Sequence, residues 1–145
     1  KKAVVRWKVR KNDGNVLREE ESELEVPALT ALFLPKCELP ELDPFTEYVS
    51  YELFLDGTWV SAGSVLFIMP KYFAFQNPNL SWTLQGDEIT VHADAYAKSV
   101  EIRNEQDDLI LTDNFFDLNA DSRTVKILSG KPEGIRVKSV YDIGR

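Results

Sequence analysis

Acidic side chains are the first candidates for chemistry in this chain, because acid–base catalysis commonly needs a pair of carboxylates. Five aspartates gather in the second half of the sequence: Asp107, Asp108, Asp113, Asp117 and Asp121. They stand in stretches that are typical of turns, where aspartate is favoured for its local hydrogen bonds. Their spacing also departs from the calcium-binding loop, which needs acids at alternate positions followed by glycine. The pattern predicts turn residues, with no catalytic pair and no metal site.

One histidine and one cysteine are the remaining candidates for nucleophilic or metal chemistry. His92 falls on the polar face of a predicted strand opposite Ser81, without a motif that would supply an orienting acid and an oxyanion hole. Cys37 stands next to Lys36, which could lower the pKa of a thiol, but no histidine motif accompanies it. A typical zinc site needs more ligands than these. We therefore expect no catalytic residue, no metal and no cofactor.

The composition and net charge of the chain argue against several classes of partner. Its 145 residues include 17 basic and 24 acidic side chains, which gives a net charge of -7. Nucleic acids and anionic membrane surfaces need clustered Lys and Arg, so neither is expected. No apolar run approaches the roughly 20 residues of a membrane helix. The single cysteine permits no internal disulfide, and no signal-peptide pattern is seen in this piece. The location is unknown from the piece itself, and a cytoplasmic one is favoured for a longer protein that contains it.

Short strands bounded by turn residues fill the first half of the sequence. Apolar and basic residues alternate over residues 5–10, which predicts a strand with one dry face. Asn12-Asp13-Gly14-Asn15 predicts a tight turn after it. The glutamate-rich run 16–26 is interpreted as a strand with a solvated face, with a helix over residues 18–24 as the alternative. Residues 28–34 predict a further strand.

A hairpin with two aromatic residues is predicted next. Residues 48–55 form its first strand, and Asp56-Gly57 is the residue pair that a two-residue hairpin turn favours. A strand over residues 64–69 follows. A two-residue loop gives two cross-strand pairs: Leu53 with Val60, and Phe54 with Trp59. The second pair then lies on the face opposite the core, where we expect an interdomain contact or a covered sheet face. A carbohydrate platform is the alternative, because aromatic faces offer apolar area beside polar edges.

A second series of strands follows Pro70. The hairpin around Gly86-Asp87 pairs Leu84 with Ile89 and Trp82 with Val91, which places Trp82 in the core. Short strands at about eight- to twelve-residue spacing predict an all-β fold. About five strands precede Pro70 and about seven follow it. We therefore expect two small immunoglobulin-like antiparallel β-sandwich units in tandem, residues 1–70 and 71–145, with the first incomplete.

The stretch from Asp113 to Leu118 is unusual, because two adjacent aromatic residues are bracketed by acids. Asp113 and Asn114 are expected to form a turn. Phe115 and Phe116 are expected to form a structural plug, with Phe116 anchored between the two sheets of the second unit.

This stretch resembles a recurrent segment of β-mannosidase-like enzymes of glycoside hydrolase family 2. The family pattern reads Ser-Asp-Asn-Tyr-Phe-Asp-Leu-Leu-Pro-Gly-Glu, so Phe115 replaces Tyr and residues 119–122 depart from Leu-Pro-Gly-Glu. Residues 89–100 are similar to the central strands of the family's C-terminal immunoglobulin-like domain. Residues 65–73 resemble the join from the sandwich domain that precedes it.

The resemblance implies a non-catalytic C-terminal β-sandwich segment of such an enzyme, with a β-mannosidase as the expected parent. In this family two catalytic glutamates lie on an upstream (β/α)8 barrel and remove terminal non-reducing mannose by a retaining mechanism. No catalytic residue is carried over to this chain. The chain begins Lys1-Lys2-Ala3 without methionine, which fits a piece of a longer polypeptide.

Several alternatives stay open at this point. An exo-β-glucosaminidase or a β-galactosidase of the same family are alternatives for the parent. An independent carbohydrate-binding or interaction sandwich is the alternative for the chain itself, since sandwiches host many functions. The expected partners are the upstream barrel and sandwich domains of the parent. Carbohydrate, and a second copy joined through the incomplete first sandwich, are further candidates.

Overall fold

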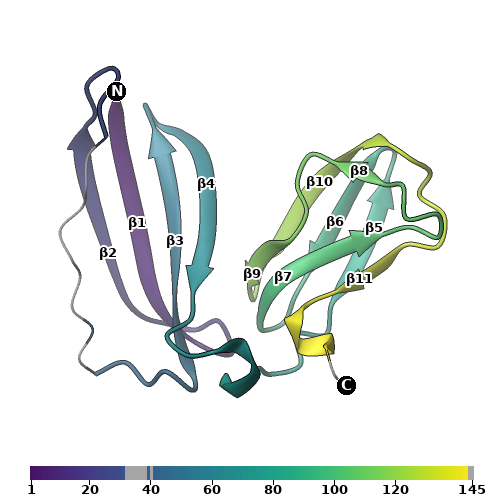
Figure 1. The fold of residues 1–145 in the computed structure, drawn as a ribbon, viewed down its shortest axis with the longest axis horizontal. Coiled ribbons are helices and arrows are strands. Elements are labelled where there is room, and N and C mark those ends of the chain that lie inside the picture. The colour runs from purple at the N-terminus through teal and green to yellow at the C-terminus, as the bar shows by residue number, and fades with distance from the viewer. Residues whose placement is uncertain (32–38, 40, 144–145) are drawn as a thin grey trace. The chain divides into compact units, whose positions relative to one another are not determined.

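The computed structural model describes residues 1–31, 39 and 41–143. Among these residues all the long elements are antiparallel β-strands, and helix occurs only as two short 3-10 turns. The all-β class that the sequence predicts is confirmed. Two compact units make up the chain (Figure 1): Lys1–Lys11 with Val16–Phe73, and Asn12–Asn15 with Ala74–Arg145.

The first unit is a four-stranded antiparallel sheet in the order β2-β1-β3-β4. Two of its residues, Tyr48 and Phe73, are buried and meet edge to face, with ring centroids 6.3 Å apart. A short 3-10 turn, η1 (Pro70–Tyr72), follows the sheet. The four strands are β1 (Lys2–Lys11), β2 (Val16–Glu25), β3 (Glu47–Leu55) and β4 (Thr58–Val65).

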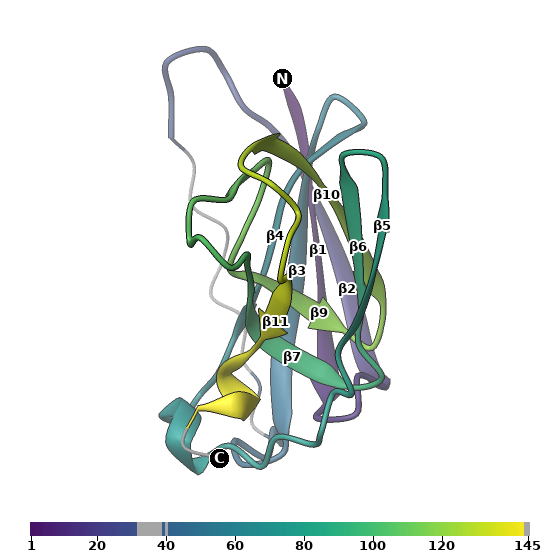
Figure 2. The same ribbon diagram turned by 90° about the vertical axis from the view of Figure 1, so that its right-hand side faces the viewer.

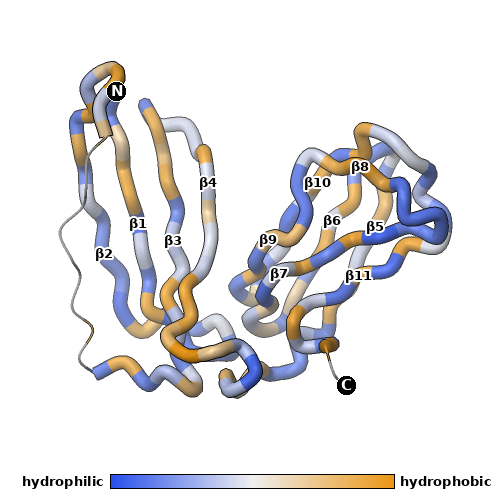
Figure 3. Tube along the Cα trace, in the orientation of Figure 1, coloured by the Kyte–Doolittle hydropathy of each residue, from blue (hydrophilic) through white to orange (hydrophobic). Residues whose placement is uncertain are grey.

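Strand β2 is the glutamate-rich run, and Figure 3 shows a long hydrophilic stretch along it. Its acids stand opposite the basic residues of β1, because the antiparallel register pairs Arg6 with Glu21 and Lys8 with Glu19. Arg6 Nε lies 2.5 Å from Glu21 Oε2. The hydrogen bond and charge of Glu21 raise the pKa of Arg6. The strand prediction for this run is therefore confirmed, and the charges meet on one face of the sheet.

The β3–β4 hairpin differs from the predicted register in one respect. Phe54 pairs with Trp59 as expected, but Leu53 pairs with Ser61 instead of Val60. The register shifts between Leu53 and Phe54, so Val60 is the extra residue of a β-bulge. Val60 is 46% exposed. A bulge of this kind is common at a sheet edge, and β4 is an edge strand.

Two other predictions for the first half need correction. The strand expected over residues 28–34 begins in a turn instead, because Leu29 adopts a positive φ of 57°. Residues 32–34 of that prediction lie outside the described residues, as does Cys37. The strand expected over residues 64–69 ends at Val65, since Pro70 opens η1 and Met69 is its N-cap.

The second unit consists of two antiparallel sheets, in the orders β5-β6-β10-β8 and β11-β7-β9 (Figures 1 and 2). Two facing antiparallel sheets are the architecture of an immunoglobulin-like sandwich. A 3-10 turn, η2 (Val140–Asp142), follows the last strand. The seven strands are β5 (Ser81–Gln85), β6 (Glu88–His92), β7 (Tyr96–Arg103), β8 (Ile110–Leu111), β9 (Phe116–Asn119), β10 (Ser122–Ser129) and β11 (Arg136–Lys138).

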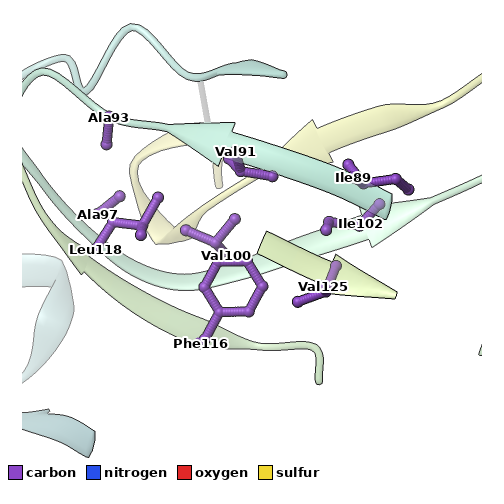
Figure 4. Close-up of a cluster of buried hydrophobic side chains, with 9 residues drawn as sticks. All are labelled: Ile89, Val91, Ala93, Ala97, Val100, Ile102, Phe116, Leu118 and Val125. Carbon is purple, nitrogen blue, oxygen red and sulfur yellow. The ribbon is translucent and has the colours of Figure 1, made fainter. Parts of the chain in front are cut away.

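A buried apolar cluster fills the second unit. Figure 4 shows its side chains gathered from strands of both sheets. Phe116 is 5% exposed and belongs to this cluster. The nine members are Ile89, Val91, Ala93, Ala97, Val100, Ile102, Phe116, Leu118 and Val125.

Strand β5 has the predicted register but not the predicted burial. Trp82 pairs with Val91 and Leu84 with Ile89, as the sequence indicates. Val91 and Ile89 are fully buried, whereas Trp82 is 40% exposed. The difference arises because β5 is the edge strand of its sheet and has β6 as its single neighbour. The prediction that Trp82 lies in the core is therefore wrong.

The turn before β2 requires a glycine. Gly14 has a φ of 89°, and a Cβ atom at this position would lie 2.6 Å from the Cβ atom of Ala120. Asn12, in the same turn, donates from Nδ2 to the carbonyl oxygen of Ala74 at 2.7 Å. These contacts explain why residues 12–15 belong to the second unit. At Gly14 both the positive φ and the lack of space for a Cβ atom require glycine.

Truncation of the buried aromatic tests the importance of this core. Phe116→Ala removes a ring that is 5% exposed, so we expect the free energy of unfolding of the second unit to fall by about 3–5 kcal/mol. Chemical denaturation, followed by NMR signals of that unit, measures the change. Leu128→Ala is the control, because Leu128 is 62% exposed and should change stability by less than about 0.5 kcal/mol. A loss below about 1 kcal/mol for Phe116→Ala would contradict the core assignment.

Candidate functional site

The stretch from Asp113 to Leu118 connects β8 to β9 and is fixed to β7 by one side-chain amide. Asn114 Oδ1 accepts a hydrogen bond from the backbone nitrogen of Ile102 at 2.9 Å. Asn114 Nδ2 donates to the carbonyl oxygen of the same residue at 3.1 Å. The Asn114 side chain thus satisfies both backbone polar groups of a β7 residue, as a neighbouring strand would do.

Three aspartates of this region accept hydrogen bonds from nearby backbone or side-chain nitrogens. Asp117 Oδ1 accepts from the backbone nitrogen of Ser99 at 2.8 Å, within the interval where the β7–β9 register shifts. Asp121 Oδ1 accepts from the backbone nitrogen of Asn119 at 2.8 Å. Asp108 Oδ1 accepts from Asn104 Nδ2 at 2.6 Å. These contacts account for the acids as local structural residues.

Asp113 and Asp107 are engaged in ion pairs. Asp113 Oδ2 lies 3.2 Å from Arg123 Nη1, and the Arg123 guanidinium lies over the Phe116 ring at 5.2 Å. Asp107 Oδ1 lies 3.9 Å from Arg103 Nη1 and 3.6 Å from Arg136 Nη2. All five aspartates singled out by the sequence therefore hold the fold of the second unit, through hydrogen bonds or ion pairs.

The two phenylalanines of the stretch separate onto opposite sides of the backbone. Phe116 points into the core and is 5% exposed, whereas Phe115 is 62% exposed. Phe115 also has a φ of 60°. The prediction that Phe115 shares in the plug is therefore wrong, because the left-handed residue turns its side chain away from the sheets while Asn114 and Phe116 stay fixed.

Phe54 and Trp59 lie side by side across β3 and β4. Trp59 is 43% exposed and Phe54 is half-buried. The guanidinium of Arg6 lies 4.8 Å from the centre of the Phe54 ring. This is the face on which the charges of β1 and β2 also meet. The pair forms an aromatic surface with a cation beside it, which suits contact with a protein surface or with a sugar ring.

His92 forms a hydrogen-bonded set that the sequence reasoning did not predict. Its Nδ1 lies 2.8 Å from Ser122 Oγ and its Nε2 lies 3.1 Å from Asp94 Oδ1. Ser81 pairs with His92 in register, but the hydroxyl partner comes from β10 on the other side. Asp94 follows His92 by two positions. That spacing could have signalled a shared side, because alternate residues of a strand point the same way.

The set of Ser122, His92 and Asp94 differs from a hydrolase triad. In the Ser-His-Asp triad the serine bonds to Nε2 and the acid to Nδ1, whereas here the two nitrogens are exchanged. The His92 and Asp94 side chains are 48% and 57% exposed. Water therefore competes for each bond, and the set is a surface hydrogen-bond network.

Metal binding and membrane spanning find no support within residues 1–31, 39 and 41–143. In this part of the chain, no group of three or more His, Cys, Asp or Glu side chains is arranged to hold a metal ion. The same residues include no helix with the length and apolar character to cross a membrane.

Ser122 is expected to be chemically inert, because Ser122, His92 and Asp94 form a surface hydrogen-bond network. Treatment of the chain with a fluorophosphonate should leave Ser122 unlabelled, and mass spectrometry of the intact chain measures this. The Ser122→Ala variant is the control for labelling elsewhere. A stoichiometric adduct on Ser122 that is absent from Ser122→Ala would show an activated hydroxyl and contradict the surface-network reading.

Comparison with known proteins assigns a domain family to each of the two parts of the chain. Residues 1–72 match the family model for the mannosidase Ig/CBM-like domain, and residues 75–143 match the mannosidase model for an Ig-fold domain. No curated protein matches the chain.

A solved structure is similar to the chain in fold. The crystal structure of beta-D-mannosidase from Dictyoglomus thermophilum matches with a TM-score of 0.75 and 14% sequence identity. The match covers 95% of this chain and 18% of that chain, so the chain spans about a fifth of the length of that protein. At this identity the likeness concerns the fold. The family matches carry the conclusion that the chain belongs to the mannosidase immunoglobulin-like domains, with a mannosidase Ig/CBM-like domain followed by an Ig-fold domain.

Proposed function

We propose that the chain is a non-catalytic C-terminal segment of a β-mannosidase of glycoside hydrolase family 2. The single observation that carries the proposal is the order of two different mannosidase domains, which together occupy residues 1–72 and 75–143. The parent protein, meaning the longer protein to which the segment belongs, hydrolyses terminal non-reducing β-mannosides. The fold match over 95% of the chain supports the same order of domains.

The use of the acidic side chains supports a non-catalytic role. A retaining glycosidase needs two carboxyl groups about 5–5.5 Å apart on either side of the scissile bond. In the second unit the candidate aspartates bind backbone nitrogens, an asparagine amide or arginines instead. In this proposal another part of the parent supplies the catalytic pair, and an upstream (β/α)8 barrel is the expected part.

The segment contributes structure to the parent enzyme. Its first unit presents Phe54 and Trp59 beside Arg6, and this surface docks against a neighbouring domain of the parent. Aromatic and arginine side chains are enriched in such contacts. A carbohydrate platform at the same pair is the second candidate function, favoured by the 43% exposure of Trp59.

An activity assay separates the segment from its parent. The 145-residue chain should show no hydrolysis of 4-nitrophenyl β-D-mannopyranoside above buffer, because the proposal assigns the catalytic pair to another part of the parent. The full-length parent should hydrolyse this substrate in preference to the corresponding β-D-glucosaminide and β-D-galactopyranoside. Release of nitrophenol, followed by absorbance, measures both.

Two results would contradict the proposal. Turnover by the chain alone, retained after repurification, would show that it carries its own catalytic residues. A parent that prefers the galactoside or the glucosaminide would assign the segment to one of the other enzymes considered above.

A further inference from the structure

Phe115 is a bulky aromatic residue at a position where the fold favours glycine or asparagine. Its φ of 60° lies in the left-handed region, which an L-residue with a large side chain adopts at a cost in free energy. Its side chain is 62% exposed, so burial does not offset that cost. Strained residues of this kind often mark functional positions. Neither the backbone nor the core explains a phenylalanine here.

The neighbouring residues hold Phe115 in this exposed position. Asn114 is bonded to both backbone polar groups of Ile102, and its Oδ1 also accepts from the backbone nitrogen of Phe115 at 3.0 Å. On the other side, Phe116 is fixed in the core. The loop backbone is thus determined at both ends, and an exposed aromatic face is presented in advance of any ligand.

A groove of about 280 Å³ lies beside this aromatic face. Phe115 and Leu109 supply apolar surface to its lining, while Arg103, Glu101 and Asp107 supply hydrogen-bonding groups. Polar residues outnumber apolar ones in this lining, so Phe115 is its one exposed aromatic surface among hydrogen-bonding groups. The volume is just below the range of about 300–1,000 Å³ for pockets that hold drug-sized ligands, which suits a ligand of one ring.

The charges of the groove favour an uncharged ligand. Arg103 is paired with Glu101 and Asp107, and Asp107 is also paired with Arg136. The lining itself carries one positive side chain, Arg103, and two negative ones, Glu101 and Asp107. Arg136 lies outside the lining and compensates the second acid through its pair with Asp107. An anionic ligand would be repelled by Glu101 and Asp107, and a cationic ligand by Arg103. Either would have to break one of these ion pairs to form its own. A ligand with several hydroxyl groups can donate to the carboxylates and accept from the guanidinium groups without disrupting the pairs.

We propose that this groove binds a neutral sugar ring, with one apolar face of the ring on Phe115 and its hydroxyls hydrogen-bonded to Arg103 and Asp107. The proposed function gives the second unit no ligand, so this binding site is an addition to it. The site can be present whether or not the parent is a β-mannosidase.

Titration of the 145-residue chain with methyl β-D-mannopyranoside and methyl β-D-glucopyranoside tests the site. NMR spectra of the labelled chain should show saturable shifts at Phe115, Arg103 and Asp107, with a Kd in the millimolar range for at least one sugar. Phe115→Ala should abolish these shifts. Leu128→Ala is the matched control, because Leu128 is also 62% exposed and belongs to the same unit; it should bind like the original chain.

The Phe115→Gly variant distinguishes a binding role from a structural one. Glycine adopts a positive φ without strain, so the Tm of the second unit should stay unchanged or rise while sugar binding is lost. A fall in Tm would show that Phe115 stabilises the fold and would overturn the argument from strain.

Other outcomes would also overturn the proposal. These are no saturable shift with either sugar up to tens of millimolar, or binding that survives Phe115→Ala. Shifts confined to Phe54 and Trp59 would likewise contradict it and would favour a platform on the first unit. None of these results bears on hydrolysis by the full-length parent, so the two proposals fail separately.

Discussion

The second unit depends on the pair of hydrogen bonds between the Asn114 amide and the backbone of Ile102. A buried backbone group without a partner is costly, and here one side chain satisfies both groups of a core residue that is 1% exposed. The same bonds fix the loop that leads into β9. They determine that Phe116 enters the core and that Phe115 stays outside. One polar contact thus accompanies both the burial of Phe116 and the exposure of Phe115.

The polar residues of the chain are largely devoted to its own structure. Glutamates of β2 pair with bases of β1, and Asp117 and Asp121 accept from backbone nitrogens. These contacts give each of the acids a structural role of its own. Among the described residues, Trp59 on the first unit and Phe115 on the second are exposed aromatic side chains. This division fits a segment that binds and supports while another part of the protein does the chemistry.

The strand pattern could be predicted because alternation and turn residues are local signals. The registers Trp82 with Val91 and Phe54 with Trp59 followed from hairpin length alone. Exposure could not be predicted in the same way, since whether Trp82 is covered depends on where β5 falls in the sheet order. The bulge at Val60 and the left-handed Phe115 were missed as well. The bulge lies in an edge strand, a place in the sheet that local alternation does not reveal. The conformation of Phe115 accompanies the contact of Asn114 with Ile102, twelve residues away.

Hydrogen exchange at the Ile102 amide tests the central contact most directly. If Asn114 Oδ1 accepts from this amide, its exchange in the folded chain is slow, and Asn114→Ser makes it fast while Val91 amide protection in β6 is retained. Rapid exchange at Ile102 in the unaltered chain, or protection unchanged in Asn114→Ser, would contradict the role assigned to the Asn114 side chain.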